Sequence, residues 1–263
     1  MNKTNNIGIF DSGVGGLSIW KELHQLMPFE NTLYLADSLN APYGNKSVDE
    51  ILSLSIKNTE TLIKMGSKII VVACNTATTN AISTLRNTYD VPIIGIEPAI
   101  KPAALNTLSK NIGILATRGT LNSSLFVSTS NEFTNSITLH EVIGEGLVTL
   151  IENGKLHSPE IDLLLKKYTD DLIKKEIDYL VLGCTHYPFL IPQLKKLIPS
   201  TIQIIDSGEA VARQTQAVLE MNNLLNISNT KPELQFYNNK HIETMIQLLD
   251  SYKNDVLINT LSF

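Results

Sequence analysis

The sequence predicts an α/β fold of two similar halves, each with a mainly parallel sheet flanked by helices. Short β-branched runs alternate with stretches of helical periodicity, which is the order typical of parallel sheets with right-handed crossovers. Residues 6–10 (NIGIF) are echoed 105 residues later by residues 111–115 (NIGIL). The only two cysteines, Cys74 and Cys184, lie 110 residues apart, each after a buried-type run. The near-constant offset favours a pseudo-twofold pair of halves with a cleft between them, and coincidence is the alternative.

Composition and charge narrow the class of protein. The chain has 263 residues, of which 43% are apolar and 18% charged, a balance that can bury a substantial core. The net charge is −5 and no basic cluster exceeds a Lys pair, so we find no electrostatic footprint for nucleic acid. No apolar run is long enough for a membrane span, and the N-terminal MNKTNNIGIF lacks the apolar core of a signal peptide. We therefore expect a cytoplasmic protein with free thiols.

The first half alternates strands and helices. Strands are predicted at residues 7–10, 32–36, 69–72 and 92–96, from their short apolar runs. Helices are predicted at about residues 17–27, 48–65 and 77–87, from apolar residues at helical spacing. Pro28 ends the first of these helices, and Gly66 caps the second.

The first predicted strand runs into a glycine-rich turn at residues 11–18 (DSGVGGLS). Glycines allow a tight turn and can point N–H groups at a ligand. The G-x-G-G spacing is not the dinucleotide fingerprint, and no Gly-Lys-Ser/Thr follows as in a Walker loop. A plain strand-to-helix turn is the competing interpretation. A second turn, at Pro42, Tyr43 and Gly44, is rigid and carries an aromatic hydroxyl, although taken alone it indicates a surface loop.

The second half repeats the pattern with less definition. Strands are predicted at residues 111–115, 136–142, 178–183 and 201–205. Helices are predicted at residues 144–151, 161–175, 190–197 and 209–221. A polar loop then covers residues 222–231, followed by an apolar segment at 233–237, a helix near 241–249 and a last strand at 256–259.

Each cysteine comes where a strand would end, which is where open α/β sheets bind ligands. Buried packing is the default interpretation of a lone cysteine. A metal site lacks further ligands at suitable spacing, and a disulfide is disfavoured in a reducing compartment. The remaining hypothesis is a pair of acid–base thiols on opposite faces of one substrate, which explains why each half carries one cysteine in the same local context.

Proton transfer across a carbon needs such a pair. One thiolate removes a proton from one face and the opposite thiol returns a proton to the other, so their titrations are coupled. Asp11 and His186 can tune the thiols or carry protons. Neutral hydrogen bonds to the substrate's polar groups can come from Ser12, Asn75, Thr76 and Thr185.

Four segments together resemble the glutamate racemases of the aspartate/glutamate racemase family. They are residues 11–18 (DSGVGGLS), 42–44 (PYG), 73–77 (ACNTA) and 182–188 (LGCTHYP). The resemblance covers about residues 6–210. It implies interconversion of L- and D-glutamate without cofactor or metal, for peptidoglycan synthesis. It also implies a first domain of residues 1–97 and 209–263 with Cys74, and a second of residues 98–208 with Cys184, with the active site between them.

Carried over residue by residue, the resemblance makes Cys74 the base that acts on D-glutamate and Cys184 the base that acts on L-glutamate. It implies that Asp11, Asp37 and His186 assist the thiols. It places the following residues at the substrate: Asp11, Ser12, Pro42, Tyr43, Gly44, Asn75, Thr76, Thr117, Thr120, Thr185 and His186. Residues 139–150 depart from the family pattern, since the usual Ala-Cys-Pro is absent, which leaves the place of Glu145 open.

Two alternatives remain. One is a racemase of aspartate or another small amino acid, because the same two-thiol logic serves several substrates. The other is a non-catalytic protein that binds a small ligand, although binding alone needs no thiol on either face. We expect glutamate as the small-molecule partner, and neither nucleic acid nor membrane. The oligomeric state is open, with a homodimer among the expected forms.

Overall fold

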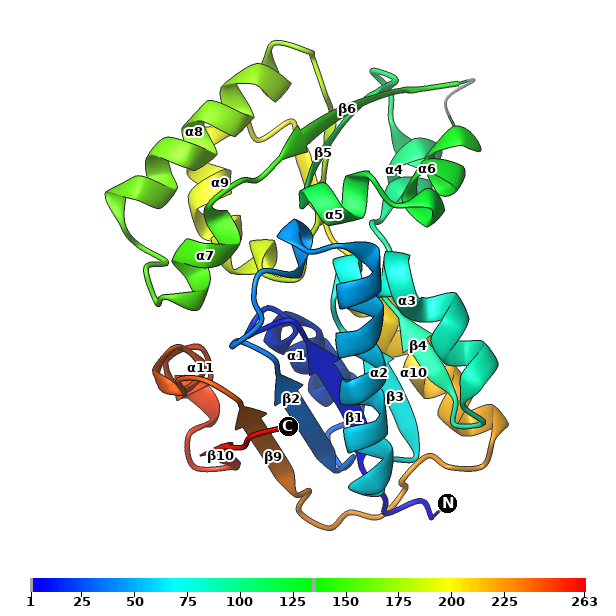
Figure 1. Ribbon diagram of the computed structural model, residues 1–263. Coiled ribbons are helices and arrows are strands. Elements are labelled where there is room, and N and C mark those ends of the chain that lie inside the picture. Colours follow the sequence, from blue (N-terminus) through cyan, green and yellow to red (C-terminus); the bar gives the residue numbers. More distant parts are fainter. Residues whose placement is uncertain (1, 134–135) are drawn as a thin grey trace.

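The computed structural model describes residues 2–133 and 136–263, which form two parallel sheets flanked by helices (Figure 1). The first sheet has six strands in the order β10-β9-β2-β1-β3-β4, all parallel. Their bounds are β1 Ile7–Asp11, β2 Thr32–Ala36, β3 Ile69–Val72, β4 Ile93–Gly95, β9 Leu234–Asn238 and β10 Val256–Thr260. The strands predicted for the first half are therefore confirmed, and the chain's last two strands extend this sheet.

The second sheet has four parallel strands in the order β6-β5-β7-β8. They are β5 Asn111–Ala116, β6 Thr138–Ile143, β7 Tyr179–Gly183 and β8 Gln203–Ile205. This order repeats β2-β1-β3-β4 of the first sheet strand for strand. The echo at residues 6 and 111 thus marks equivalent strands, and so do the two runs that lead into Cys74 and Cys184. The predicted fold of two similar halves is confirmed.

The helices around the first sheet follow local sequence signals. They are α1 Leu17–Leu26, α2 Val48–Lys64, α3 Asn75–Thr88, α10 Gly208–Met221 and α11 Glu243–Leu248, with short 3₁₀ turns η1 Tyr43–Asn45 and η3 Asp250–Tyr252. Ser47 and Glu50 form a capping box at the start of α2, and Gly66 follows its end at φ +85°. Helix α10 packs against α1, so the chain returns to this half after the second sheet.

The helices around the second sheet are less regular and correct the prediction in part. They are α4 Ile100–Asn106, α5 Arg118–Leu121, α6 Ser124–Asn131, α7 Leu147–Glu152, α8 Pro159–Ile173, η2 Tyr187–Leu190 and α9 Ile191–Leu197. Helices α4, α5 and α6 were absent from the prediction, because they are too short for a clear helical period. Helix α7 begins at Leu147 rather than at 144, because Gly146 has φ +84°.

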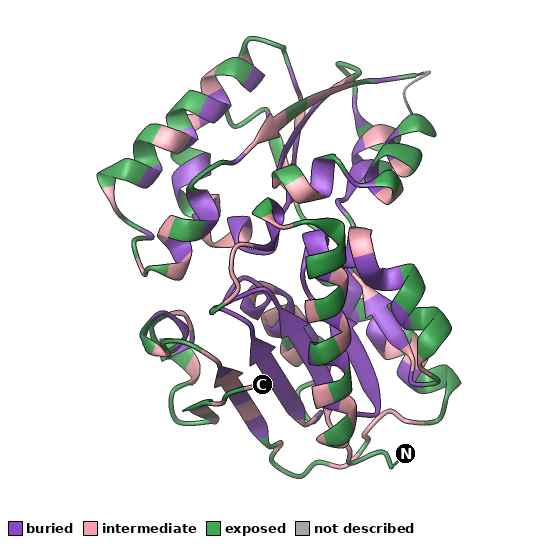
Figure 2. Cartoon of the chain, in the orientation of Figure 1, coloured by how far each residue is buried: buried purple, intermediate pink, exposed green. Residues whose placement is uncertain are grey.

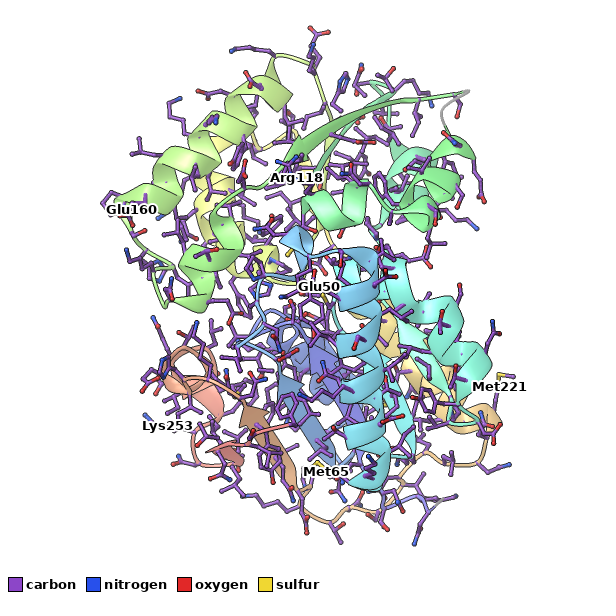
Figure 3. All side chains as sticks on the ribbon, viewed as in Figure 1. Glu50, Met65, Arg118, Glu160, Met221 and Lys253 are labelled. Atoms are coloured by element: carbon purple, nitrogen blue, oxygen red, sulfur yellow. The ribbon has the colours of Figure 1, made fainter. Side chains whose placement is uncertain are left out.

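The strands are largely buried and form the centre of the core, whereas the helices expose their outer faces to solvent (Figure 2). One apolar cluster runs through both halves and includes Ile9 and Trp20 of the first and Leu182 and Tyr187 of the second. Side chains fill the space around both sheets (Figure 3). The strands of the first sheet come from residues 7–95 and 234–260, and those of the second from residues 111–205. The domain boundaries at 97/98 and 208/209 stay a prediction.

One buried ion pair fastens the polar loop at residues 222–231 to the first half. Lys68 Nζ lies 2.5 Å from Glu30 Oε2, and both side chains are almost fully buried. Lys68 also donates to the carbonyl of Leu224, and Glu30 accepts from the N–H of Asn226. Among residues 2–133 and 136–263, no helix is long and apolar enough to cross a bilayer.

Candidate active site

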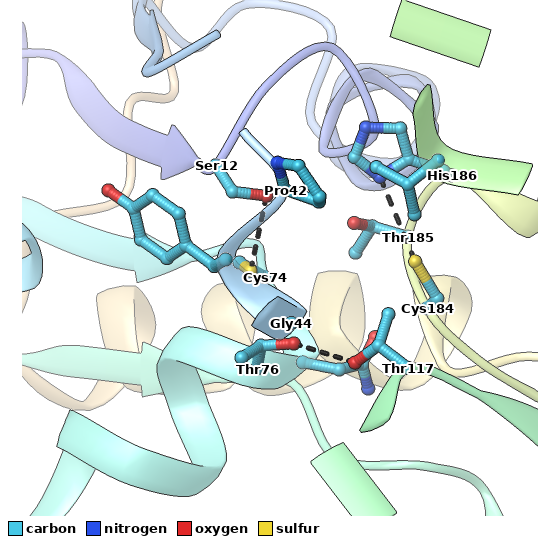
Figure 4. A pocket seen from close by; sticks show the side chains of 12 residues that line it. Ser12, Pro42, Gly44, Cys74, Thr76, Thr117, Cys184, Thr185 and His186 are labelled. Carbon is cyan, nitrogen blue, oxygen red and sulfur yellow. Dashed lines mark hydrogen bonds between the residues drawn. The ribbon is translucent and has the colours of Figure 1, made fainter. Parts of the chain in front are cut away.

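A narrow pocket lies between the two halves, beside the carboxyl ends of β3 and β7 (Figure 4). Residues of both halves line it: Ser12, Pro42, Tyr43, Gly44, Cys74, Asn75, Thr76, Thr117, Val148, Cys184, Thr185 and His186. All of these except Val148 were predicted from the sequence. Three predicted residues, Asp11, Asp37 and Thr120, lie behind the wall of the pocket rather than in it.

Cys74 lies between the end of β3 and the start of α3, where it is the N-cap residue of the helix. Its Sγ accepts from the N–H of Ala77 at 3.4 Å and lies 3.6 Å from Ser12 Oγ. Burial, and after it the nearby Asp11 carboxylate, raises the pKa of Cys74 well above its ordinary value. The contacts with Ala77 and Ser12 lower this pKa only in part. At neutral pH, Cys74 is therefore a protonated thiol.

Cys184 has a different neighbour, a buried imidazole. Its Sγ lies 3.8 Å from Nδ1 of His186, and Nε2 of the same ring lies 2.6 Å from Glu152 Oε1. Burial opposes a charge on His186, but the hydrogen bonds to Cys184 and Glu152 raise its pKa well above the ordinary value. The ring is therefore an imidazolium that donates to both partners, and it places positive charge beside the Cys184 sulfur.

Glu152, at the end of α7, is a residue that sequence reasoning missed. It accepts from the N–H of Val14 and from Ser38 Oγ, both at 2.7 Å, as well as from His186. Burial opposes its charge, but the bonds to His186 and Val14 lower the pKa of Glu152 below its usual value. Nothing local in the sequence signals this role, because Glu152 precedes Asn153 and Gly154 like an ordinary exposed acid at a helix end.

Asp11 ends β1 and is fully buried beneath the glycine-rich turn. Its Oδ2 accepts from the N–H groups of Gly13 and Gly16, at 3.2 and 3.0 Å, and Thr185 Oγ1 lies 3.4 Å from its Oδ1. Burial raises the pKa of Asp11 to about 6, while His186 lowers it. Three N–H groups of this turn, those of Gly13, Val14 and Gly16, therefore hold the carboxylates of Asp11 and Glu152.

The glycines of this turn allow the close approach of the other half. A Cβ on Gly13 would lie 2.0 Å from Glu152 Oε1, and one on Gly15 would lie 2.1 Å from His186 Nδ1. Real Cβ atoms do not come this close to other heavy atoms. The turn is therefore the surface against which the Glu152–His186 pair packs.

Asp37 lies behind Tyr43 and contacts neither thiol. The Tyr43 hydroxyl donates to Asp37 Oδ2 at 2.5 Å, and Asn58 Nδ2 donates to the same hydroxyl at 3.1 Å. Burial and the Asp37 carboxylate raise the pKa of Tyr43, so the phenol stays neutral. The structure thus connects Asp37 to the wall formed by Tyr43, and its assistance to the thiols stays a prediction.

Three threonine hydroxyls join the two halves at the pocket, and Figure 4 shows the contact between two of them, Thr76 and Thr117. Thr76 Oγ1 lies 2.8 Å from Thr117 Oγ1 and 3.3 Å from Thr120 Oγ1, and the last two are 3.0 Å apart. Thr120 is fully buried, so it orients the other two hydroxyls rather than facing the pocket.

Asn75 is the pocket residue whose hydrogen-bonding capacity is unused. Its side chain is 3% exposed, and neither Oδ1 nor Nδ2 has a partner among the described residues. A buried amide without partners costs free energy, so such a group calls for an explanation. A polar ligand in the pocket supplies one.

Comparison with known proteins identifies the class that this fold and pocket define. Residues 21–215 match the family described as Asp/Glu/Hydantoin racemase, which covers most of the chain. The protein is an amino-acid racemase. The chain belongs to the Asp/Glu/hydantoin racemase family. Its resemblance to the glutamate racemases of that family is confirmed.

Individual glutamate racemases match this chain in sequence or in fold over most of its length. The chain is 47% identical over 220 residues to a glutamate racemase of Ectopseudomonas mendocina, covering 83% of this chain and 84% of that one. A glutamate racemase isoform of Bacillus anthracis superposes with a TM-score of 0.87 at 29% identity, over 100% of this chain and 99% of the other. Escherichia coli glutamate racemase, solved with L-glutamate and the activator UDP-MurNAc-Ala, gives 0.83 at 31% identity over 98% of both chains.

Proposed function

We propose that this protein interconverts L- and D-glutamate by proton transfer between Cys74 and Cys184, without a cofactor. The observation that carries the proposal is that each half contributes one buried thiol, from an equivalent strand end, to the same pocket. A reaction that moves a proton from one face of a carbon to the other requires such a pair. Glutamate as the substrate is supported by the relatives, one of which was solved with L-glutamate bound.

In the L-to-D direction, Cys184 removes the α-proton and Cys74 returns one. The Cα–H bond breaks as an S–H bond forms on Cys184, and the electron pair stays on the α-carbon. The Cys74 S–H bond then breaks as a new Cα–H bond forms on the opposite face. The positive charge of His186 beside Cys184, and the raised pKa of Cys74, prepare this direction. The return reaction exchanges the two roles.

The neutral donors of the pocket bind the substrate's polar groups in this proposal. Among the described residues, no Lys or Arg lines the pocket that holds the two thiols. Asn75 offers an unused amide, and Ser12, Thr76 and Thr117 offer hydroxyls. Donors fixed in a site without bulk water stabilise the charge that develops on the substrate. We infer further that the product D-glutamate supplies peptidoglycan synthesis in the cytoplasm, as the family resemblance implies.

Exchange of the α-proton in heavy water, followed by NMR, tests the proposal. Wild-type protein is incubated with L- or D-glutamate without added cofactor, beside the Cys74→Ala and Cys184→Ala variants. We expect exchange and racemisation by the wild type, and a loss of racemisation by about 10²–10⁴-fold or more in each variant, the usual scale of one acid or base. Binding of glutamate without exchange would support the binding-protein alternative. Faster turnover of aspartate than of glutamate would assign aspartate as the substrate.

A further inference from the structure

A second, larger cavity adjoins the pocket and leads to solvent. The two cavities share four lining residues, Pro42, Gly44, Thr117 and Val148. The pocket residues beyond these four are buried, whereas Asn45 and Thr149 of the second cavity are exposed. Helix α5 packs against η1 at this place, and a Cβ on Gly44 would lie 2.9 Å from Thr117 Cβ. We call this second cavity the mouth.

Two opposite charges lie at the mouth, on the wall formed by the second half. Arg118, the first residue of α5, has its Nη2 3.8 Å from Oε1 of Glu145, in the turn between β6 and α7. Their side chains are 54% and 75% exposed. Arg118 lies close to where the two halves meet (Figure 3). An exposed pair at this distance contributes little to stability, so stability does not account for its position.

The negative charge of the substrate can explain why Arg118 lies at the mouth. Glutamate carries a net charge of −1 near neutral pH, and the protein carries −5. The buried carboxylates Asp11 and Glu152 lie behind the pocket wall, near His186. Among the described residues that line the pocket and the mouth, Arg118 is the only Lys or Arg and Glu145 the only acid. A cation at the rim of a narrow cleft raises the local concentration of an anionic substrate.

We propose that Arg118 captures the carboxylate of the incoming substrate at the mouth, and that Glu145 holds and partly masks Arg118 until then. This inference rests on the proposed function, since it assumes an anionic amino acid as substrate. Arg118 is a positioning residue in this scheme, because it acts before the substrate reaches the thiols. Residues 139–150, where the sequence departs from the family pattern, thereby provide the partner of the capturing charge.

Steady-state kinetics of Arg118→Gln, Arg118→Lys and Glu145→Gln test the inference. We expect Arg118→Gln to raise KM about three- to tenfold with kcat within about twofold of wild type, because the loss affects capture and not proton transfer. Arg118→Lys should restore most of the loss, and Glu145→Gln should lower KM about twofold. The two enantiomers have equal free energies, so kcat/KM must change equally in both directions. The test therefore depends on whether the change appears in KM or in kcat.

The dependence of KM on ionic strength also tests the inference, because a purely structural role of Arg118 would not affect it. The wild-type KM should rise between 0.01 and 0.15 M salt, since the screening length falls from about 30 to 8 Å. Arg118→Gln should lose most of this dependence. Arg213→Gln is the matched control, because Arg213 also pairs with an exposed glutamate, Glu209, at 60% and 75% exposure, but away from the pocket and the mouth.

The outcomes separate this inference from the proposed function. Turnover of glutamate by the wild type tests the function alone. An active wild type with the same KM and salt dependence in Arg118→Gln would overturn the inference and leave the function standing. If the wild type instead acts on aspartate, the proposed substrate fails, and the same comparison is made with aspartate, which carries the same net charge. A fall in kcat without a change in KM would also overturn capture by Arg118.

Discussion

At the scale of single residues, the two thiols have the same chemistry but opposite electrostatic settings. Cys74 is buried with the Asp11 carboxylate nearby, and both raise its pKa and favour the neutral thiol. Cys184 lies 3.8 Å from the imidazolium of His186, so a positive charge lies beside its sulfur. In the proposed mechanism, this asymmetry distinguishes the two thiols that act on opposite faces of the α-carbon.

Glu152→Gln should weaken the imidazolium at His186. The folded-state pKa of His186 is raised, so the charge persists above about pH 6.5 and is lost only as pH rises through that raised value. Without the carboxylate the ring loses its proton at a lower pH, so the alkaline limb of kcat/KM should move to lower pH. A charge-assisted hydrogen bond contributes about 1.5–3 kcal/mol, so kcat should fall about 10- to 100-fold.

The pH profile of kcat/KM measures this shift, with Glu160→Gln as the control. Glu160 is an exposed acid whose pairing with Lys155 lies at the surface. An alkaline limb that stays in place in Glu152→Gln would show that Glu152 does not govern His186. The sequence could predict His186 from its place after Cys184 and Thr185, but it could not predict Glu152. The partner lies 34 residues away and is brought in by packing alone.

At the scale of elements, the glycine-rich turn after β1 decides how closely the halves approach. Its backbone donates to Asp11 and Glu152, and its glycines leave room for His186. The sequence predicted the strand, the turn and the following helix, because each has a strong local signal. It did not predict that the ligand of the turn's N–H groups is the protein itself. Helices α5 and α6 escaped prediction for a related reason, since the side-chain caps Thr117 and Ser123 define their starts more than any apolar period does.

Gly15→Ala tests the close approach at this turn. The added Cβ would lie 2.1 Å from His186 Nδ1, so the ring must move away from Cys184 or Glu152. We expect kcat to fall at least tenfold, with a loss of about 1–3 kcal/mol in the free energy of unfolding, as for other overpacked sites. Gly66→Ala is the control. Gly66 has φ +85°, so an alanine there is strained and lowers the free energy of unfolding, but its Cβ would meet no atom closer than 3.6 Å and Gly66 does not line the pocket. Equal kcat in the two variants would contradict the argument.

At the scale of the whole molecule, the pocket exists only where the halves meet. Thr76 and Thr117 face each other from opposite halves, and Ser18 Oγ donates to the carbonyl of Thr185 at 2.8 Å. A ligand that bridges the same walls adds contacts to both halves at once. Its binding free energy therefore stabilises the folded molecule as a unit, through linkage between binding and unfolding.

Asn75→Leu separates the stability of the unliganded molecule from that of its complex. At a glutamate concentration of about 100 times Kd, the wild type should gain about 2.7 kcal/mol. For a chain of this size that raises Tm by roughly 5–10 °C. Because the Asn75 amide has no partner among the described residues, its replacement by an apolar side chain of similar size should leave the unliganded Tm within a few degrees of wild type. The shift with glutamate should largely disappear, as thermal unfolding at increasing glutamate can measure. A lower unliganded Tm with an undiminished glutamate shift would instead make Asn75 a structural residue, and the hydroxyls of Ser12, Thr76 and Thr117 would then have to hold the substrate unaided.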